Sequence, residues 1–268
     1  MKIASFGAAI AALLLLGGCS GAQFRLPDIS SADVDRAALT VSGDSSRLEK
    51  FQRTDAQYRT MVFDVSHRLA EAAPALCRYA EVSNCRFSVS FSSEDEVNAY
   101  ATANNEIVVY RGLLELLETE DEFAAVIAHE IGHHLAQHID ETQTNATIGA
   151  IIGGVLAGGA MIALGYDSAY YQNQKMMEDS MNLGASIGVL SYSKEQEREA
   201  DLLAAYLLDR AGYDLHEAGR VWEVLAKVNG RTSSGMLDSH PAGPERMVAW
   251  NLAIAEVEAS KTKLPVTD

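Results

Sequence analysis

Basic residues are scarce in this chain. Its 268 residues include 21 Lys and Arg against 37 Asp and Glu, which gives a formal net charge of −16. Such an acidic chain lacks the basic surface that contacts with nucleic-acid phosphates require, so we expect no nucleic-acid partner. The same charge argues against electrostatic attraction to anionic lipids, so any membrane attachment must come from another source. The sequence also contains no internal repeat, Walker loop or dinucleotide-binding fingerprint.

Cysteines are also few in this chain. Apart from Cys19, the chain contains only Cys77 and Cys85, and neither lies near the histidine-rich motif described below. We therefore expect no cysteine at a metal site. In an exported chain, which folds in an oxidising compartment, the close pair Cys77–Cys85 is expected to form a disulfide that closes a short loop. Two free structural thiols are the alternative.

The N-terminus has the features of an export signal over residues 1–18. Lys2 carries its single positive charge, and the apolar run that follows is too short to span a membrane. The sequence Leu-Gly-Gly-Cys ending at Cys19 has the form of a bacterial lipobox, which predicts a lipid anchor; an ordinary signal peptide with an incidental cysteine is the alternative. Because Ser20 follows instead of Asp, the lipoprotein sorting pattern favours the periplasmic face of the outer membrane.

The rest of the chain divides into a tether, one domain and a tail. Residues 19–45 show little periodicity, which is typical of a tether. Residues 46–260 are enough for one domain with a sizeable core, and residues 261–268 are expected to fray. Within the domain, a long helical pattern covers 46–76, and patterns typical of strands cover 87–92, 97–102 and 107–110. These patterns predict a mostly helical α+β fold with a sheet of about three strands.

The stretch 146–166 is apolar and contains Gly-xxx-Gly spacings, which permit either a membrane helix or close helix packing. Its many glycines weaken a lone helix. We therefore expect a soluble segment packed against the helices that carry the candidate site.

The sequence His129-Glu130-Ile131-Gly132-His133 lies in a segment with apolar residues at helical spacing. Positions i and i+4 of a helix share a face, so both histidines can point the same way. Two imidazoles so placed supply half of a tetrahedral zinc site, and Glu130 beside them can act as general base for a zinc-activated water. A chance match is the alternative for the motif alone.

A second motif, Glu-Arg-Glu-Ala-Asp at 197–201, offers the missing ligand. The segment 194–210 has a helical pattern, and its small apolar stripe contains Glu197, which therefore faces inward. Glu195 and Glu199 fall toward the charged side of the same helix. Asp201, one turn beyond Glu197, can accept a hydrogen bond from a ligand imidazole. Glutamates that only solvate a helix face are the alternative reading of this motif alone.

With SHPAGPERM at 239–247 as a third motif in the same order, the chain resembles the M48 (Ste24-type) zinc metalloendopeptidases, in particular their small soluble periplasmic members. The resemblance covers about residues 50–255 and implies a zincin-like pair of catalytic helices with one Zn²⁺ per chain. It implies that His129, His133 and Glu197 bind the metal and that Glu130 is the general base. It places His240 near the metal, where it can mask the site, and places Arg246 near the catalytic centre, where this residue or another nearby donor can stabilise the oxyanion.

The resemblance also implies a substrate-binding edge strand at VNAYA, 97–101, in which Asn98 and Ala99 are the candidate contacts. An ordinary strand or turn asparagine is the alternative for Asn98. An open edge of this kind binds extended peptides through their main chain. The expected function is therefore cleavage of unfolded or misassembled cell-envelope proteins. The alternative is a binding or assembly factor for outer-membrane proteins, linked to their assembly machinery, in which the zinc site is masked.

Overall fold

The computed structural model describes residues 22–43, 48–102, 104–142, 192–229, 240 and 243–267. The predicted leader with Cys19 and the glycine-rich stretch 146–166 lie outside these residues. Among the residues that are described, no helix is both long and apolar enough to cross a membrane.

Helices dominate, and the three strands form one small sheet, so the predicted α+β fold is confirmed. The helices are α2 (Ser31–Gly43), α3 (Asp55–Ala72), α4 (Pro74–Tyr79), α5 (Arg111–Leu114), α6 (Glu120–Leu135), α9 (Lys194–Ala211), α10 (Leu215–Ala218), α11 (Arg220–Asn229) and α13 (Pro244–Ala259). The strands are β1 (Ser88–Ser92), β2 (Ala99–Ala101) and β3 (Glu106–Tyr110).

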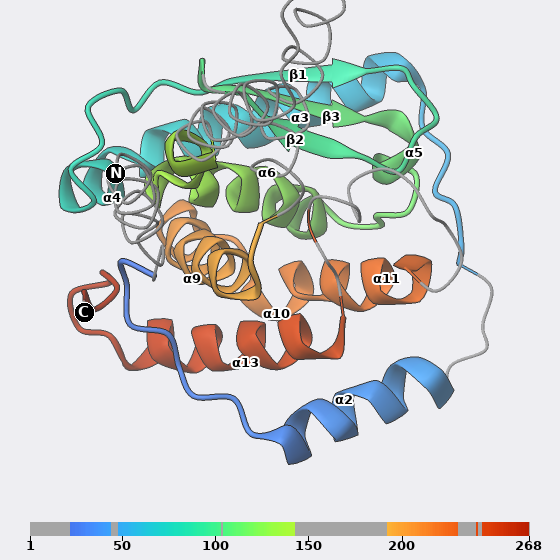
Figure 1. Ribbon diagram of the computed structural model, residues 1–268. Coiled ribbons are helices and arrows are strands. Elements are labelled where there is room, and N and C mark those ends of the chain that lie inside the picture. Colours follow the sequence, from blue (N-terminus) through green and yellow to red (C-terminus); the bar gives the residue numbers. More distant parts are fainter. Residues whose placement is uncertain are drawn as a thin grey trace, which may run out of the picture.

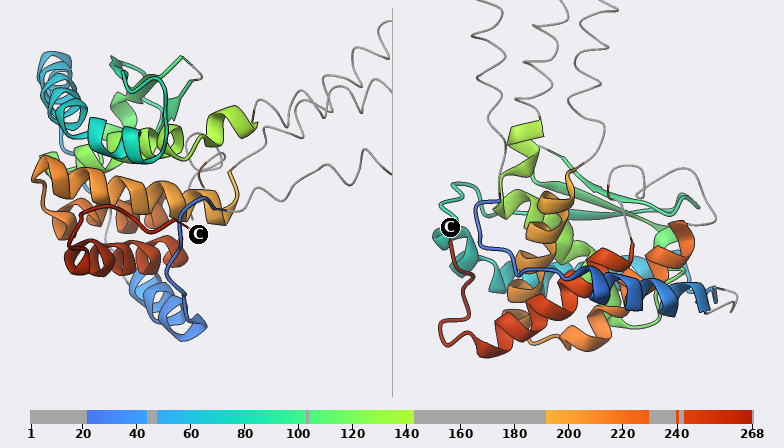
Figure 2. Two further views of the ribbon diagram at one scale, coloured as in Figure 1. Left: turned by 90° about the vertical axis from the view of Figure 1, so that its left-hand side faces the viewer. Right: turned by 60° about the horizontal axis from the view of Figure 1, so that its bottom comes forward.

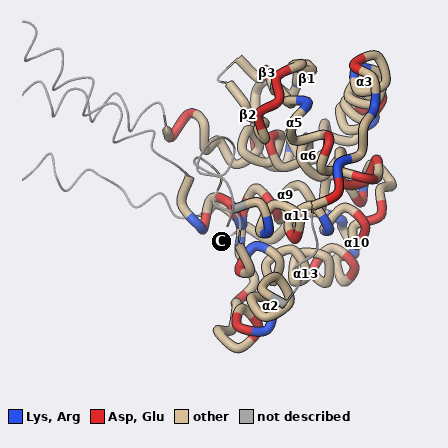
Figure 3. The backbone as a smooth tube through the Cα atoms, turned by 90° about the vertical axis from the view of Figure 1, so that its right-hand side faces the viewer, with Lys and Arg blue, Asp and Glu red and all other residues tan. Residues whose placement is uncertain are grey.

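The elements form layers in which α6 and α9 are central. Figures 1 and 2 show the sheet and α3 on one side of α6, with α9 on its other side, then α13, and α2 outermost. Both central helices are covered on two sides (Figure 3), and 14 of the 16 residues of α6 and 12 of the 18 residues of α9 are buried. A polar group on a covered face of either helix is therefore removed from water and needs partners inside the protein.

The sheet has the order β1-β3-β2, with β1 parallel and β2 antiparallel to β3. Strand β2 is therefore at an edge, and no other strand among the described residues pairs with its outer side. It is also the strand nearest α6 (Figure 1). The predicted helix over 46–76 is shorter than expected, because Thr54 caps the N-terminus of α3 and Pro74 begins a separate helix.

Helix α6 begins where its sequence provides a strong start. Thr119 accepts a hydrogen bond from the Glu122 backbone N–H, and the Glu122 side chain accepts one from the Thr119 N–H, which is a capping box. Three acidic residues in the first turn also interact favourably with the helix dipole. Ser193 and Gln196 form the same capping box at the start of α9. Local sequence thus fixes where both central helices begin.

The N-terminal segment and the tail pack against each other, which corrects the predictions of a tether and a frayed end. Phe24 is buried and forms a β-bridge with Thr267, and the Arg25 N–H donates to Val266 O at 2.8 Å. Farther along, α2 lies against α13 (Figure 2). The physical reason is pairing between the two ends of the described chain, which no local pattern shows.

Gly132 lies where α6 and α9 cross most closely. A Cβ atom at this position would lie 2.4 Å from the carbonyl oxygen of Ala200 on α9. We expect Gly132→Ala to force the helices apart and to lower the free energy of unfolding by about 1–3 kcal/mol. It should also weaken zinc binding, because the predicted ligands lie on both helices. Urea denaturation and zinc titration measure the two effects.

Gly243→Ala is the matched control, because a Cβ at Gly243 meets nothing within 4 Å and its backbone is extended. Equal stability of the two variants would contradict the close-approach argument.

Candidate metal centre

Four side chains converge between α6 and α9. His129 and His133 come from α6, Glu197 comes from α9, and His240 comes from the chain before α13. All four are buried, and each contributes one ligand atom to a group whose atoms lie within 4.8 Å of one another. This group could hold one metal ion.

The distances within the group match a tetrahedral zinc site. His129 Nε2 lies 3.2 Å from His133 Nε2 and 3.3 Å from His240 Nδ1. Glu197 Oε1 lies 3.4 Å from His133 Nε2 and 2.9 Å from His240 Nδ1. Bonds of about 2.0–2.1 Å to a tetrahedral zinc ion place neighbouring ligand atoms about 3.3 Å apart. Three imidazoles and one carboxylate are also ligands that zinc prefers.

Charge in the group suits a cation. Burial of the Glu197 carboxyl acts to raise its pKa, but Arg246, His240 and His129 outweigh burial and hold that pKa well below its ordinary value. Burial is also the main cause that lowers the pKa of His133 well below its ordinary value. Glu197 is therefore ionised and His133 neutral. These are the protonation states that metal ligands need.

Glu130 has no hydrogen bond at the centre of this site. Both of its carboxylate oxygens are buried, and neither has a hydrogen-bond partner among the described residues. Its nearest charged neighbour in the group is His240, whose Nε2 lies 3.8 Å from Glu130 Oε1. A buried carboxylate without a partner is costly. Such a group is a candidate for proton transfer, because no hydrogen bond from the described residues occupies its oxygens.

Arg246 links two carboxylates behind the ligands. Its Nη1 lies 2.7 Å from Glu197 Oε2, while Nη2 and Nε donate to Asp201 at 2.7 and 2.9 Å. The guanidinium also lies over the Trp222 ring, 4.0 Å from its centre. Asp201 Oδ1 in turn lies 2.9 Å from Nδ1 of His129, where it can accept a hydrogen bond from that imidazole.

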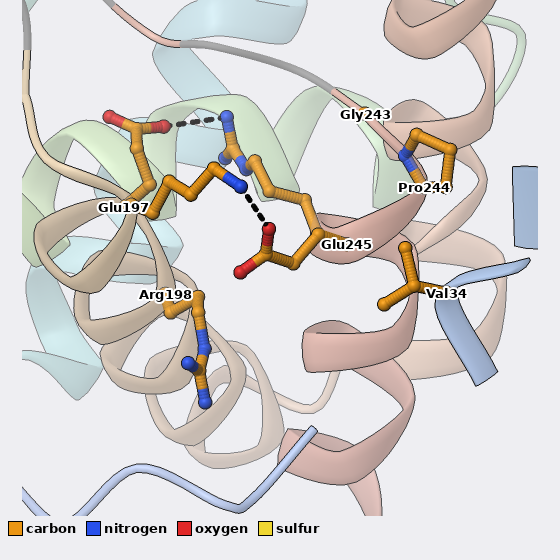
Figure 4. Close-up of a pocket in the computed structure, with 8 residues that line it drawn as sticks. Val34, Glu197, Arg198, Gly243, Pro244 and Glu245 are labelled. Atoms are coloured by element: carbon orange, nitrogen blue, oxygen red, sulfur yellow. Dashed lines mark hydrogen bonds and ion pairs between the residues drawn. The ribbon is translucent and has the colours of Figure 1, made fainter. Parts of the chain in front are cut away.

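A cavity of about 290 Å³ borders Glu197 and is lined by residues of α2, α9 and α13. Figure 4 shows Glu197 on one side of the cavity, with Val34 of α2 and Pro244 of α13 on the opposite side. Glu245 and Lys194, which both line the cavity, form an ion pair at 2.6 Å. Val34 belongs to the segment 19–45, which was predicted to be a tether. This segment therefore forms part of the cavity wall beside Glu197, a predicted metal ligand.

Sequence reasoning missed several residues that contact the group. Tyr192 stacks on His133 with ring centres 3.9 Å apart, and Trp222 contacts His129 edge to face at 5.3 Å. The prediction that Glu199 faces the charged side of its helix is wrong: it is fully buried and accepts hydrogen bonds from Phe24 N–H and His138. The reason is the N-terminal segment, which covers that side of α9.

The remaining predicted residues lie away from the group. Asn98 directly precedes β2, and its side-chain amide donates to Glu96 at 3.1 Å. Ala99 is buried at the start of β2. Cys77 and Cys85 form a disulfide that closes the loop after α4.

A profile of peptidase family M48 matches residues 64–251, more than half of the chain. The chain belongs to peptidase family M48. Metalloprotease LoiP of Escherichia coli (strain K12) is 28% identical over 261 residues, which cover 92% of this chain and 94% of LoiP. Mitochondrial metalloendopeptidase OMA1 of Arabidopsis thaliana is 29% identical over 231 residues, 85% of this chain and 44% of that protein.

The beta-barrel assembly-enhancing protease of Yersinia pestis is 26% identical over 236 residues, 86% of this chain and 47% of that protein. The chain therefore spans nearly all of LoiP but less than half of the other two relatives. The family is one of zinc metalloproteases, and the four converging side chains fit that ion. The resemblance seen in the sequence motifs is thus confirmed for the family, and together these findings support a zinc metalloprotease.

Proposed function

We propose that this protein is a zinc-dependent endopeptidase in which His129, His133 and Glu197 bind the ion. When bound by these three side chains, zinc would supply activation of a water molecule and polarisation of the scissile carbonyl. Glu130 takes a proton from the attacking water and passes it to the leaving amine. The observation that carries the proposal is the buried Glu130 carboxylate, which has no hydrogen bond among the described residues and follows a ligand histidine on α6.

Arg246 was predicted to lie at the catalytic centre, where it would stabilise the oxyanion. Its contacts favour a different role. The guanidinium is buried, pairs with Glu197 and Asp201, and packs on Trp222. A cation engaged in this way holds the Glu197 ligand in place and has little freedom to follow a reacting carbonyl. We propose that Arg246 is a positioning residue.

The substrates we propose are unfolded or extended polypeptides of the cell envelope. The supporting feature is the outer edge of β2, the strand that begins at Ala99 directly after Asn98. Among the described residues, no strand pairs with this edge. A peptide added to that edge would form main-chain hydrogen bonds that do not depend on its sequence. Such binding selects for extended chains.

The test is cleavage of β-casein, an unfolded protein, by the purified zinc-loaded protein. We expect fragments that disappear with a chelator and return with zinc. A disulfide-bonded folded protein should resist cleavage until it is reduced and unfolded. Cleavage that persists in the metal-free protein would contradict the proposal.

We also propose an anchored location at the periplasmic face of the outer membrane, through lipid on Cys19. A relative is named for enhancing beta-barrel assembly, which agrees with such a location. Cys19→Ala should move the protein from the membrane fraction to the soluble fraction. Unchanged fractionation would contradict the anchor.

A second candidate function follows from the position of His240. This residue is 2% exposed, and its Nδ1 lies 2.9 Å from Glu197 Oε1, where it takes the fourth place in the group. A zinc site so filled has no open position for water, as catalysis requires. In that state the protein would act as a binding or assembly factor for outer-membrane proteins.

The His240→Ala variant separates the two candidate functions. Because it removes the fourth ligand, we expect faster cleavage of β-casein with one zinc ion still bound per chain. His216→Ala is the matched control, since His216 lies exposed on α10. Slower cleavage by the His240→Ala variant would show that His240 assists catalysis and does not mask the site.

A further inference from the structure

A buried hydrogen-bonded chain leads away from the metal centre behind His133. Nε2 of this ring faces the other ligand atoms, at 3.2 Å from His129 Nε2. Its Nδ1 lies on the opposite side, 2.9 Å from Nδ1 of His138. His138 is 2% exposed and follows α6 after a turn at Gln137, whose backbone is left-handed. The turn brings a second imidazole directly behind the ligand.

The series of hydrogen bonds continues from His138 to the N-terminal segment. His138 Nε2 lies 2.9 Å from Glu199 Oε2, and the other Glu199 oxygen accepts the Phe24 backbone N–H at 2.7 Å. Glu199 is fully buried, so these partners replace water. Residues 24 and 199 are 175 positions apart in the sequence. One carboxylate therefore ties the first described residues of the chain to the back of the metal centre.

If His133 is neutral and its Nε2 binds the metal, one arrangement of protons satisfies every atom in this hydrogen-bonded chain. A neutral His133 that binds metal through Nε2 carries its proton on Nδ1, and donates it to Nδ1 of His138. Nε2 of His138 then carries a proton and donates to Glu199. The Glu199 carboxylate accepts this hydrogen bond and that of the Phe24 amide. Every donor has an acceptor, and the single negative charge has two donors.

The two ligand imidazoles are thus supported differently. Asp201 lies directly at Nδ1 of His129, which is the usual arrangement of a carboxylate behind a ligand histidine. Among the residues that the structure describes, the partner at Nδ1 of His133 is a second imidazole, His138, which in turn contacts the Glu199 carboxylate. We propose that His138 and Glu199 are positioning residues that orient His133 for zinc, and that the Phe24 amide completes their chain.

Other contacts hold the N-terminal segment in place on both sides of Phe24. Gln23 donates from Nε2 to Ala136 O at 2.9 Å, just after α6 ends. Arg198 donates to Pro27 O. The segment is therefore held on both sides of Phe24 by the two helices that supply the ligands. The Phe24 amide is thus fixed beside the candidate metal centre by hydrogen bonds on both sides of it.

The test is the zinc affinity of Glu199→Gln, measured by competition with a chromophoric chelator. Loss of such an outer carboxylate is expected to weaken zinc binding about 10–100-fold. Glu195→Gln is the matched control, because Glu195 is exposed on the same helix. We expect the control to bind zinc as the original protein does. The absorption spectrum of the cobalt-substituted protein should change in Glu199→Gln alone, because His133 loses its fixed orientation.

His138→Ala provides a second variant of the same chain. It should weaken zinc binding to a similar extent, and the double variant should lose little more than either single one, because both changes break one chain. Thermal unfolding of the zinc-free proteins checks that each variant folds. Normal zinc affinity and an unchanged cobalt spectrum in folded Glu199→Gln would overturn the proposal.

This inference rests on the proposed role of His133 as a ligand, and its failure can be distinguished from failure of that role. If Glu199→Gln binds zinc normally and cleaves β-casein, the chain behind His133 is unimportant while the proposed function stands. If the original protein binds no zinc, both are wrong.

Discussion

Replacing Glu130 with Gln should lower the turnover of β-casein about 10²–10⁴-fold, the range that general acid–base catalysis supplies. The amide has nearly the shape of the carboxylate but cannot accept a proton from water. The Glu130 oxygens have no hydrogen bonds to other described residues, so the contact that the change affects is the 3.8 Å approach of His240 Nε2 to Glu130 Oε1. The change also replaces a buried carboxylate that accepts no hydrogen bond from the described residues. We therefore expect zinc binding to remain and the free energy of unfolding to stay equal or rise.

The measurement is single-turnover cleavage with zinc content and thermal unfolding determined on the same samples. Glu120→Gln serves as the control, because Glu120 lies exposed in the first turn of the same helix. Its turnover should match that of the original protein. If Glu130→Gln binds zinc, folds and still cleaves at the full rate, another group is the general base.

The metal group could be predicted from the sequence because its signals are local. Residues four apart on one helix share a face, which places His129 beside His133 without any knowledge of the fold. The small apolar stripe of α9 likewise identified Glu197 as inward-facing. What the spacing could not supply was the distance between the two helices. Gly132, which permits their close approach, is the residue that sets it.

The predictions that failed concern residues whose surroundings depend on contacts between distant parts of the chain. Glu199 was placed with exposed charges because its own helix offers no reason for its burial. The reason is Phe24, whose segment shows little periodicity and packs against the end of α6, α9 and the tail. His138 was overlooked for a related cause: the left-handed turn at Gln137 redirects the chain after α6, and no helical pattern predicts that change.

The second large effect concerns Arg246, whose replacement by Ala should lower the free energy of unfolding of the zinc-free protein by about 3–5 kcal/mol. This is the usual cost of removing one partner from a buried ion pair, because the remaining charge is left uncompensated. Here two buried carboxylates, Glu197 and Asp201, would lose their cation together. Contact with the Trp222 ring would be lost as well. Urea denaturation in the presence of a chelator measures this effect without interference from metal loss.

A matched comparison is Lys194→Ala, which removes a cation from an ion pair of 2.6 Å at the surface, where its side chain is 72% exposed. Surface pairs contribute about 0–1 kcal/mol, so this variant should differ little from the original protein. Zinc affinity should fall in Arg246→Ala and stay constant in Lys194→Ala. The oxyanion role predicted from the sequence gives a different result: Arg246→Ala would then fold and bind zinc normally but turn over slowly. Stability of the metal-free protein therefore decides between the two roles, because an oxyanion donor acts only on the transition state, whereas a positioning residue acts before any substrate is bound.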